Sequence, residues 1–539
     1  MLGFGIKIRG LLRRKLQQIK QRDIDRTNEI NSFKLGKNPN VSILSKTKSI
    51  NKINVFYPLI YPYAYARIKL SEDKKELKYF VEEPILEEQE IEIYNTIKDA
   101  LIKTIDININ DLKTNEDKIS YLKKKINDIL VEFGISLKSG QYIRLLYTIY
   151  VNFVGLGKIE PLMNDPYIED ISCDGINISI YIAHKKYGNL QTNVEYKDES
   201  ELKSFIIKLA ERCERYVSYA EPVLDASLPD GSRVNAMLSE DISTHGPTYT
   251  IRKFRHIPFS IIDLIQNKTI PINIGAFLWF VIEHKQNILI CGGTSAGKTS
   301  LLNSFVLFIP PEYKIISIED TRELNLLHKN WVPNVSRTGF GQIDAYGRKY
   351  GGITMFDLLK ESFRQNPDYI IIGEVRGKEA SVLFQGMASG HPSFGTMHGG
   401  SIQEIIQRLQ SPPINLSNTM VQILDYVILI TRATKFGKSA RRLKEINFIE
   451  KIERDGNVIF RMPYKWDAKK DEFIESEESV FICLDKITEE YGINKDKCIE
   501  EIKSREKYLK YLLNKKITSF EEVHNKIQEY YNKKYAFGS

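Results

Sequence analysis

The chain has 539 residues, of which 42% are hydrophobic and 27% are charged. This length predicts two or three folded domains, and the composition is that of a globular protein, which excludes a small disulfide-stabilised domain, a fibre and a disordered chain. The 77 Lys and Arg residues and 69 Asp and Glu residues leave a formal charge of +8, which favours anionic partners only weakly. The five cysteines form no CxxC pair, so a reducing cytoplasm is expected, without a disulfide framework or a four-cysteine zinc site.

The first 70 residues are predicted to form a variable, basic segment and a linker. Seven basic residues precede the first acidic residue, Asp23. Apolar residues recur there at helical spacing, at Ile8, Leu12, Leu16 and Ile19. The pattern is compatible with a basic amphipathic helix that binds anionic lipid or an acidic partner, and equally with a frayed terminus, because nearby glycines weaken a helix. No apolar run is long enough for a membrane span or a signal peptide.

Residues 71–255 are predicted to fold as an α+β domain. A tyrosine-rich run at 55–80 alternates as strands do, and helical patterns cover residues 88–133 and 141–154. Turn residues then divide the run GLGKIEPLMNDPYIEDISCDG into short elements. Strands and helices are therefore mixed in this part of the chain.

An apolar run at residues 287–291 is typical of a buried strand, and the sequence GGTSAGKT follows it directly. This is the complete GxxxxGK[ST] pattern, whose small residues let backbone N–H groups surround a phosphate at a helix N-terminus. Lys298 is expected to reach the β- and γ-phosphates of ATP, and Thr299 to bind Mg²⁺. The predicted nucleotide-binding residues here are Gly292, Gly293, Thr294, Ser295, Ala296, Gly297, Lys298, Thr299 and Ser300.

Two further apolar strands lead to carboxylates. The strand at 314–318 runs into Glu319. The strand at 369–372 leads through Gly373, where many ATPases have an Asp, to Glu374. Open α/β sheets place their sites at the carboxyl ends of strands. Both glutamates are therefore candidates for the hydrolysis of a bound nucleotide.

Two histidines, His391 and His398, lie in the turn-rich segment GHPSFGTMH that follows the second of these strands. A lone histidine is usually a satisfied polar group. Two histidines in this position favour a sensor of the γ-phosphate or of a neighbouring subunit.

The order of four motifs resembles that of a known superfamily. GGTSAGKT, IEDTREL, IIIGEVRG and GHPSFGTMHGG look like the Walker A motif, Asp box, atypical Walker B motif and His box of the type II/type IV secretion ATPases. The phrases LDASLPDGSRVNAML, YTIRKF and RLQSPPINLS are similar to the archaeal branch that assembles pili and archaella. The resemblance covers residues 155–442.

The resemblance implies a role for each matching residue. Lys298 and Thr299 match ligands of the phosphates and of Mg²⁺. Glu319 matches the Asp-box glutamate that polarises the attacking water, and Glu374 matches the Walker B glutamate near the metal; which of the two is the base stays open. The other matches are the His-box residues, two arginines that contact phosphate and two weaker arginine-finger candidates: His391 and His398, Arg233 and Arg252, and Arg322 and Arg376.

The resemblance also implies the architecture and the function. The expected fold class is α/β, with a RecA-like P-loop ATPase core at 273–432 after the α+β domain, and with residues 256–272 as an interdomain linker and hinge. Residues 433–539 are expected to form a β-meander and helices, which are either a docking surface or a stabilising cap. The implied protein is a homohexameric ATPase, cytoplasmic and peripheral to the cell membrane. It would act on a polytopic membrane platform protein, and indirectly on pilin-like or secreted subunits, with no nucleic acid as partner.

Three other functions stay open at this point. A conjugative or DNA-uptake motor of the same superfamily is not excluded by any sequence feature. A RecA-type helicase or DNA translocase is favoured by the positive charge, but no nucleic-acid module is recognisable. A scaffold that binds ATP without turnover is disfavoured by the intact set of Lys298, Thr299, Glu319 and Glu374.

Overall fold

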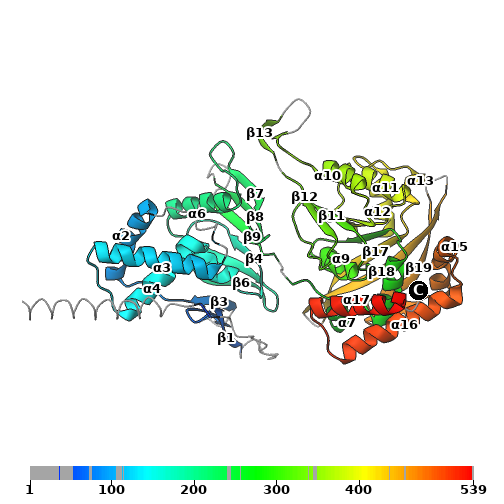
Figure 1. Ribbon diagram of the computed structural model, residues 1–539, viewed down its shortest axis with the longest axis horizontal. Helices are drawn as coiled ribbons and strands as arrows, with labels where there is room; N and C mark the ends of the chain where they lie inside the picture. Colours follow the sequence, from blue (N-terminus) through cyan, green and yellow to red (C-terminus); the bar gives the residue numbers. More distant parts are fainter. Residues whose placement is uncertain are drawn as a thin grey trace, which may run out of the picture. The chain divides into compact units, whose positions relative to one another are not determined.

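The structure is a computed structural model of the chain, and it forms two compact units, Met1–Phe254 and Arg255–Ser539 (Figure 1). The described residues are 35–36, 53–71, 76–104, 112, 114–238, 245–254, 257–337, 339–343, 349–435, 438–453 and 457–536. The division falls at the predicted end of the α+β domain. The basic helix predicted near the N-terminus lies outside the described residues.

The first unit contains a nine-stranded mixed sheet. In spatial order its strands are β1 (Asn54–Ile60), β2 (Ala64–Leu70), β3 (Leu77–Glu82), β6 (Gly188–Glu195), β5 (Ser179–His184), β4 (Ile168–Cys173), β9 (Thr248–Arg252), β8 (Arg233–Met237) and β7 (Val223–Ser227). Neighbouring strands are antiparallel except for β3 and β6, which are parallel. The domain was predicted to start at residue 71, but its sheet starts at Asn54, because β1 and β2 bury alternate side chains and hydrogen-bond in series with β3.

Helices cover one face of this sheet, on the left of the unit in Figure 1. They are α2 (Glu88–Thr104), α3 (Asn115–Glu132), α4 (Ser139–Ile149) and α6 (Glu199–Arg212). The helical pattern at 88–133 is thus two helices, and the Thr114 side chain caps the second by accepting from the Asp117 N–H. The strands bury alternate positions, so the face away from the helices carries the half-buried and exposed side chains.

The second unit also contains a nine-stranded sheet. In spatial order its strands are β12 (Trp331–Val335), β11 (Ile315–Glu319), β15 (Tyr369–Ile372), β16 (Ser393–His398), β10 (Ile288–Gly292), β17 (Tyr426–Lys435), β18 (Lys438–Ile452), β19 (Val458–Asp467) and β20 (Glu472–Glu475). The first six strands are parallel, and β17 to β20 pair antiparallel. The structure shows the predicted α/β fold and the β-meander. However, β17 crosses the predicted boundary at 432 and 433, so the meander continues the core sheet.

Both faces of the second sheet are buried under helices. One core contains residues of α7 (Ile261–Gln266), α8 (Ile272–Glu283), α9 (Lys298–Val306), α16 (Lys495–Asn514) and α17 (Phe520–Ala536). The other core contains residues of α10 (Met355–Ser362), α11 (Glu379–Ala388), α12 (Ile402–Gln410) and α13 (Asn418–Val421). In β10, Ile288 and Ile290 join the first core while Leu289 and Cys291 join the second. A strand that is covered on both sides is apolar at every position.

The segment predicted as a linker, 256–272, is largely part of the second unit. Ser260 and Asp263 form a reciprocal capping box at the start of α7. Ile261 and Ile262 lie between these two residues and are fully buried. The apolar residues of this stretch bury against the second core, and its role as a hinge stays a prediction.

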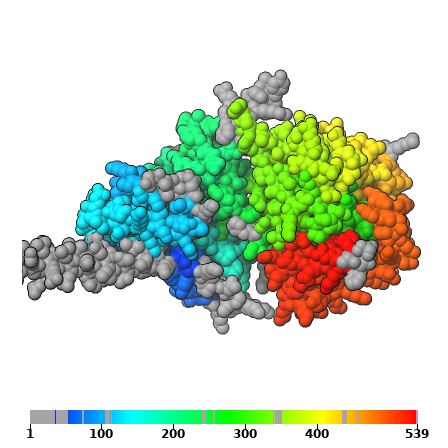
Figure 2. Space-filling model, viewed as in Figure 1, coloured from blue at the N-terminus to red at the C-terminus, as the bar shows by residue number. Residues whose placement is uncertain are grey.

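The C-terminal helices are anchored on the same unit, where Figure 2 shows them in orange and red on its surface. The Arg505 side chain is 0% exposed and pairs with Glu283 of α8. Lys534 of α17 also pairs with Glu283, at 2.7 Å, and the Tyr531 hydroxyl donates to the Phe308 carbonyl. The helices therefore pack on the core, and the two predicted roles, a docking surface and a stabilising cap, stay predictions.

Among the described residues, no helix combines the length and the apolar character needed to cross a bilayer.

Candidate active site

The loop between β10 and α9 has the backbone that the GGTSAGKT pattern predicts. A Cβ atom on Gly292 would lie 2.4 Å from the carbonyl oxygen of Ile430, and Gly297 has a φ of +101°. Both positions therefore require glycine. The loop places the first turn of α9, with Thr299 and Ser300 half-buried, directly after the carboxyl end of β10. Gly293, Thr294 and Ser295 are exposed and Ala296 is buried.

Lys298 lies at the start of α9 with its ammonium group folded over this loop. Its Nζ donates to the carbonyl oxygens of Gly292 and Gly293, each at 3.2 Å, and lies 3.4 Å from Nδ1 of His398. Burial lowers the pKa of Lys298, while the nearby Glu374 carboxylate opposes this shift. A phosphate is a stronger acceptor than these neutral carbonyls, because the hydrogen bonds would be charge-assisted.

His398 connects the loop to the carboxylate at the tip of β15. It pairs in register with Gly292 across β16 and β10, so it lies at the same edge of the sheet. Its Nε2 is 3.1 Å from Oε1 of Glu374. This is an ion-pair distance, but the two groups are not aligned for a hydrogen bond. Arg376 pairs with the other carboxylate oxygen of Glu374. Burial, and next the charge of Lys298, lower the pKa of His398. The imidazole is therefore neutral at neutral pH.

Glu319 ends β11 and is 1% exposed. Its Oε1 accepts the backbone N–H groups of Glu323 and Leu324, each at 2.9 Å. Its Oε2 is buried and has no hydrogen-bond partner among the described residues. Burial raises the pKa of this carboxyl to about 7. A group with this pKa can take up and release a proton near neutral pH.

Gly373 stands where many ATPases have an Asp, and the structure gives the reason. A Cβ atom at this position would lie 3.0 Å from Cγ of Glu319, so the Glu319 side chain occupies the space that a larger residue would need. The Thr396 hydroxyl donates to the Gly373 carbonyl at 2.6 Å, which ties the tip of β15 to β16. The absence of the Asp is thus coupled to the position of Glu319.

The side-chain oxygen atoms near the loop fit a Mg²⁺ ion that is also bound by phosphates. Within the described part of the chain, no cluster of three or more His, Cys, Asp or Glu side chains could hold a metal ion by itself. Mg²⁺ usually takes one or two protein oxygens, waters and substrate phosphates. The Thr299 hydroxyl and the Glu374 carboxylate are such oxygens, and they were predicted as the metal ligands.

The structure separates the two histidines of the His box. His391 precedes the amino end of β16, at the sheet edge opposite His398, because a six-residue strand lies between the two edges. Its Nδ1 is 3.4 Å from the Pro367 carbonyl, and its ring lies 5.4 Å from that of Phe363. Within this chain, His391 therefore does not lie beside the loop that precedes α9, and its role as a sensor of the γ-phosphate or of a neighbouring subunit stays a prediction.

The predicted arginines lie in different surroundings. Arg322 is exposed, with its guanidinium 5.3 Å from the ring centroid of Trp331. In the first unit, Arg233 and Arg252 are direct cross-strand neighbours on β8 and β9. They pair with Asp225 and Asp170 respectively, each at 3.2 Å.

Sequence reasoning missed Arg441, which lies on β18 beside the loop. Its Nε donates to the Ser295 carbonyl at 3.4 Å, and a Cβ atom on Gly297 would lie 3.0 Å from its Cδ. Neighbouring Arg442 is buried and pairs with Asp471 at 2.9 Å. The Arg-Arg pair was the only local signal, and the strand register decides which arginine lies at the loop.

Residues 154–461 match the family model described as Type II/IV secretion system protein. The chain belongs to this family, as its motifs predicted. It is 32% identical over 515 residues to an uncharacterized protein of Methanocaldococcus jannaschii, covering 92% of both chains. It is 30% identical over 237 residues to the conjugal transfer protein TrbB of Rhizobium radiobacter, covering 42% of this chain and 68% of that protein. The solved VirB11 ATPase of the Brucella suis type IV secretion system is 24% identical, with a TM-score of 0.27, over 55% of this chain and 97% of that one.

Proposed function

We propose that this secretion-family protein is an ATP-hydrolysing motor. One observation carries the proposal: Lys298, His398 and Glu374 form a continuous chain of contacts at the sheet edge where the phosphate-binding loop begins. Glu319 ends a strand of the same parallel sheet, at the same edge. Binding residues and proton-transfer residues thus converge where an α/β sheet places its substrate.

In the proposed reaction, the loop N–H groups and Lys298 would hold the phosphates, and Thr299 and Glu374 would hold the metal ion. Bound Mg²⁺ would neutralise charge that develops on the phosphates. A water oxygen attacks the γ-phosphorus while Glu319 takes its proton, and the bond to the β–γ bridging oxygen breaks to give ADP and phosphate. Glu374 is the alternative base. His398, neutral and in contact with both Lys298 and Glu374, responds to the presence of the γ-phosphate.

The larger assembly extends this proposal. We assign Arg233 and Arg252 to phosphate contacts, and Arg322 and Arg376 to arginine fingers that act across a subunit boundary. The protein would work as a cytoplasmic homohexamer at the inner face of the membrane. Its cycle would drive a membrane platform protein that assembles a pilus-like or archaellum filament, or that secretes proteins.

The test is the ATPase rate of the pure protein as a function of its concentration, with the mass of the assembly measured at each point. We expect turnover per subunit to rise steeply as a ring forms, because arginines from neighbouring subunits complete each site. Unchanged turnover in a stable monomer would contradict the shared-site motor.

A motor for conjugal DNA transfer is the second candidate. The names of relatives favour it, since TrbB and a putative conjugal transfer protein of Mycobacterium tuberculosis match the chain. Single-stranded DNA would then bind in a salt-sensitive way and stimulate the ATPase. Absence of both effects at low salt would leave the filament or secretion motor.

A further inference from the structure

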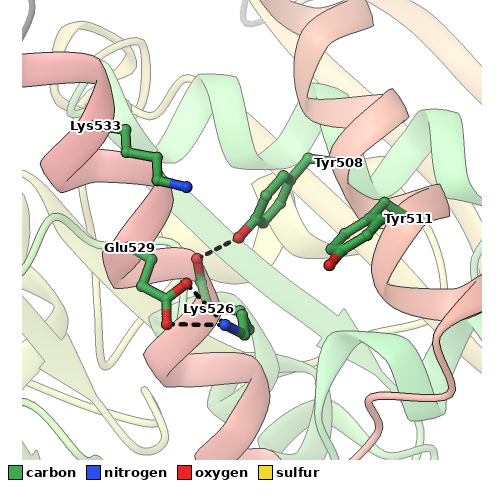
Figure 3. Close-up of a pocket in the computed structure, with 5 residues that line it drawn as sticks. All are labelled: Tyr508, Tyr511, Lys526, Glu529 and Lys533. Carbon is green, nitrogen blue, oxygen red and sulfur yellow. Dashed lines mark hydrogen bonds and ion pairs between the residues drawn. The ribbon is translucent and has the colours of Figure 1, made fainter.

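A groove lies between α16 and α17 on the surface of the second unit. It has a volume of about 400 Å³ and is lined by Tyr508, Tyr511, Lys526, Glu529 and Lys533. Figure 3 shows the two tyrosine side chains on one helix and the charged side chains on the other. None of these five residues takes part in the active site described above.

The walls of the groove are fixed by contacts behind them. The Tyr508 hydroxyl donates to the Lys526 carbonyl at 2.7 Å, as Figure 3 shows, and its ring packs 5.0 Å from that of Tyr530. Beneath them, the fully buried Arg505 holds α16 on the core. A surface whose side chains are already ordered loses little conformational entropy when a ligand binds.

The groove lining contains two lysines and one glutamate, so its net charge is +1. Glu529 is paired with Lys526 at 2.8 Å, which leaves the exposed Lys533 without an ion-pair partner among the residues that the structure describes. At the start of α17, Glu521 and Glu522 are exposed acids, whereas the exposed charged side chains of residues 503–516, on and just after α16, are all lysines: Lys503, Lys507, Lys510, Lys515 and Lys516. An anionic ligand is therefore favoured over a neutral or cationic one.

The chemistry of the lining favours a polypeptide as that ligand. Both carboxylate oxygens of Glu529 accept from Lys526, at 2.9 and 2.8 Å. Their remaining lone pairs can accept from backbone N–H groups of a polypeptide, whereas the phosphodiester backbone of a nucleic acid has no donor. The tyrosine rings line the hollow, where the side chains of an inserted chain can contact them. We propose that this groove binds an acidic polypeptide segment of a partner protein, with aromatic or aliphatic side chains between its carboxylates. This inference does not depend on ATP hydrolysis.

The experiment uses the full chain and a fluorescein-labelled peptide of repeating Glu-Leu-Glu-Tyr. The groove variant is Lys507→Glu/Lys533→Glu. Its matched control is Lys469→Glu/Lys470→Glu, which changes the charge equally on the exposed turn before β20. Tyr511→Ala tests the groove without a change of charge. Unchanged ATPase rates and melting temperatures show that each variant is folded.

We expect the groove variant to weaken the Kd for the peptide by at least about tenfold, Tyr511→Ala by about threefold to tenfold, and the control by less than about twofold. Replacing Glu by Gln in the peptide should also abolish binding. Equal losses in the groove variant and the control would overturn the proposal. Binding of a dT oligonucleotide or of phosphatidylglycerol vesicles in the groove, instead of the peptide, would also overturn it. The same holds if the groove variant changes the mass of the protein's own assembly but leaves peptide binding unaffected.

Discussion

The two nine-stranded sheets differ in what covers them. In the second unit, β10, β11 and β15 are buried at every position. In the first unit, strands such as β1 and β5 bury alternate positions. A sheet covered on both faces leaves only its edge at the strand ends for chemistry, and Lys298, Glu319, Glu374 and His398 lie there. A sheet covered on one face can present side chains such as Arg233 and Arg252 along its strands.

The largest expected effect is at the edge of the covered sheet. Lys298→Ala should lower the ATPase rate about a thousandfold, because it removes the ammonium group at the proposed phosphate-binding loop. Phosphate release by the pure, folded variant measures this. Lys314→Ala, which precedes β11 at the opposite edge of the sheet, is the control and should retain the wild-type rate. Substantial turnover in the Lys298 variant would remove this lysine from the site.

Side-chain truncation tests the difference between the two sheets directly. Leu289→Ala should cost about 3 kcal/mol of unfolding free energy, because Leu289 is 0% exposed and the change leaves a cavity. Phe56→Ala, on the exposed face of β1, should cost less than about 1 kcal/mol, because Phe56 is already 49% exposed. Urea denaturation measures both values. Equal costs would mean that the exposed face of the first sheet is covered in solution.

Each unit contains a buried histidine that should make it sensitive to acid. Burial lowers the pKa of His184 in the first unit and of His524 in the second to about 4. The unfolded chain takes up these protons near pH 6.5, so each unit should lose up to about 3 kcal/mol as the pH falls from about 6.5 to about 4. Urea denaturation as a function of pH measures this loss. His184→Gln should flatten the pH dependence of the first unit only, and an unchanged curve would contradict the assignment.

Glu319→Gln should lower the ATPase rate about a hundredfold, and the remaining rate should no longer rise through pH 7. Because burial raises the pKa of Glu319 to about 7, a base at this position is ionised above that pH, so the wild-type rate should rise through pH 7. The unfolded chain ionises this carboxyl from about pH 4.5, so the unfolding free energy of the wild type falls as the pH rises from about 4.5 to 7. The variant lacks this loss and should melt at a higher temperature than the wild type above pH 7. A wild-type pH profile in the variant would favour Glu374 as the base.

The smallest effect is expected for Arg441, which reaches the loop from β18. Arg441→Ala should raise the KM for ATP about fivefold with little change in kcat, because its guanidinium contacts the loop that binds the ground-state nucleotide. Initial rates over a range of ATP concentrations separate the two constants. Lys444→Ala, on the same strand, is the control. A loss confined to kcat would place Arg441 in the transition state instead.

Local patterns predicted much of the second unit. The apolar run before GGTSAGKT became β10, and the carboxylates after two further apolar runs lie at strand ends. A short apolar run bounded by turn residues is typical of a buried strand. The predicted boundaries at 71 and 432 were less accurate. Strand pairing decides where a sheet ends, and no local signal reports which strands pair across long sequence separations.

The sequence by itself determined the family, the glycine-containing loop between β10 and α9, and the positions of Glu319 and Glu374 along the chain. These depend on residues that are close in sequence, whose spacing sets the local backbone. Only the tertiary structure decided that His398 lies at the site while His391 does not, that Arg441 contacts the loop, and that Gly373 leaves room for Glu319. Each of these depends on the register between strands, where a shift of one residue moves a side chain to the other face of the sheet.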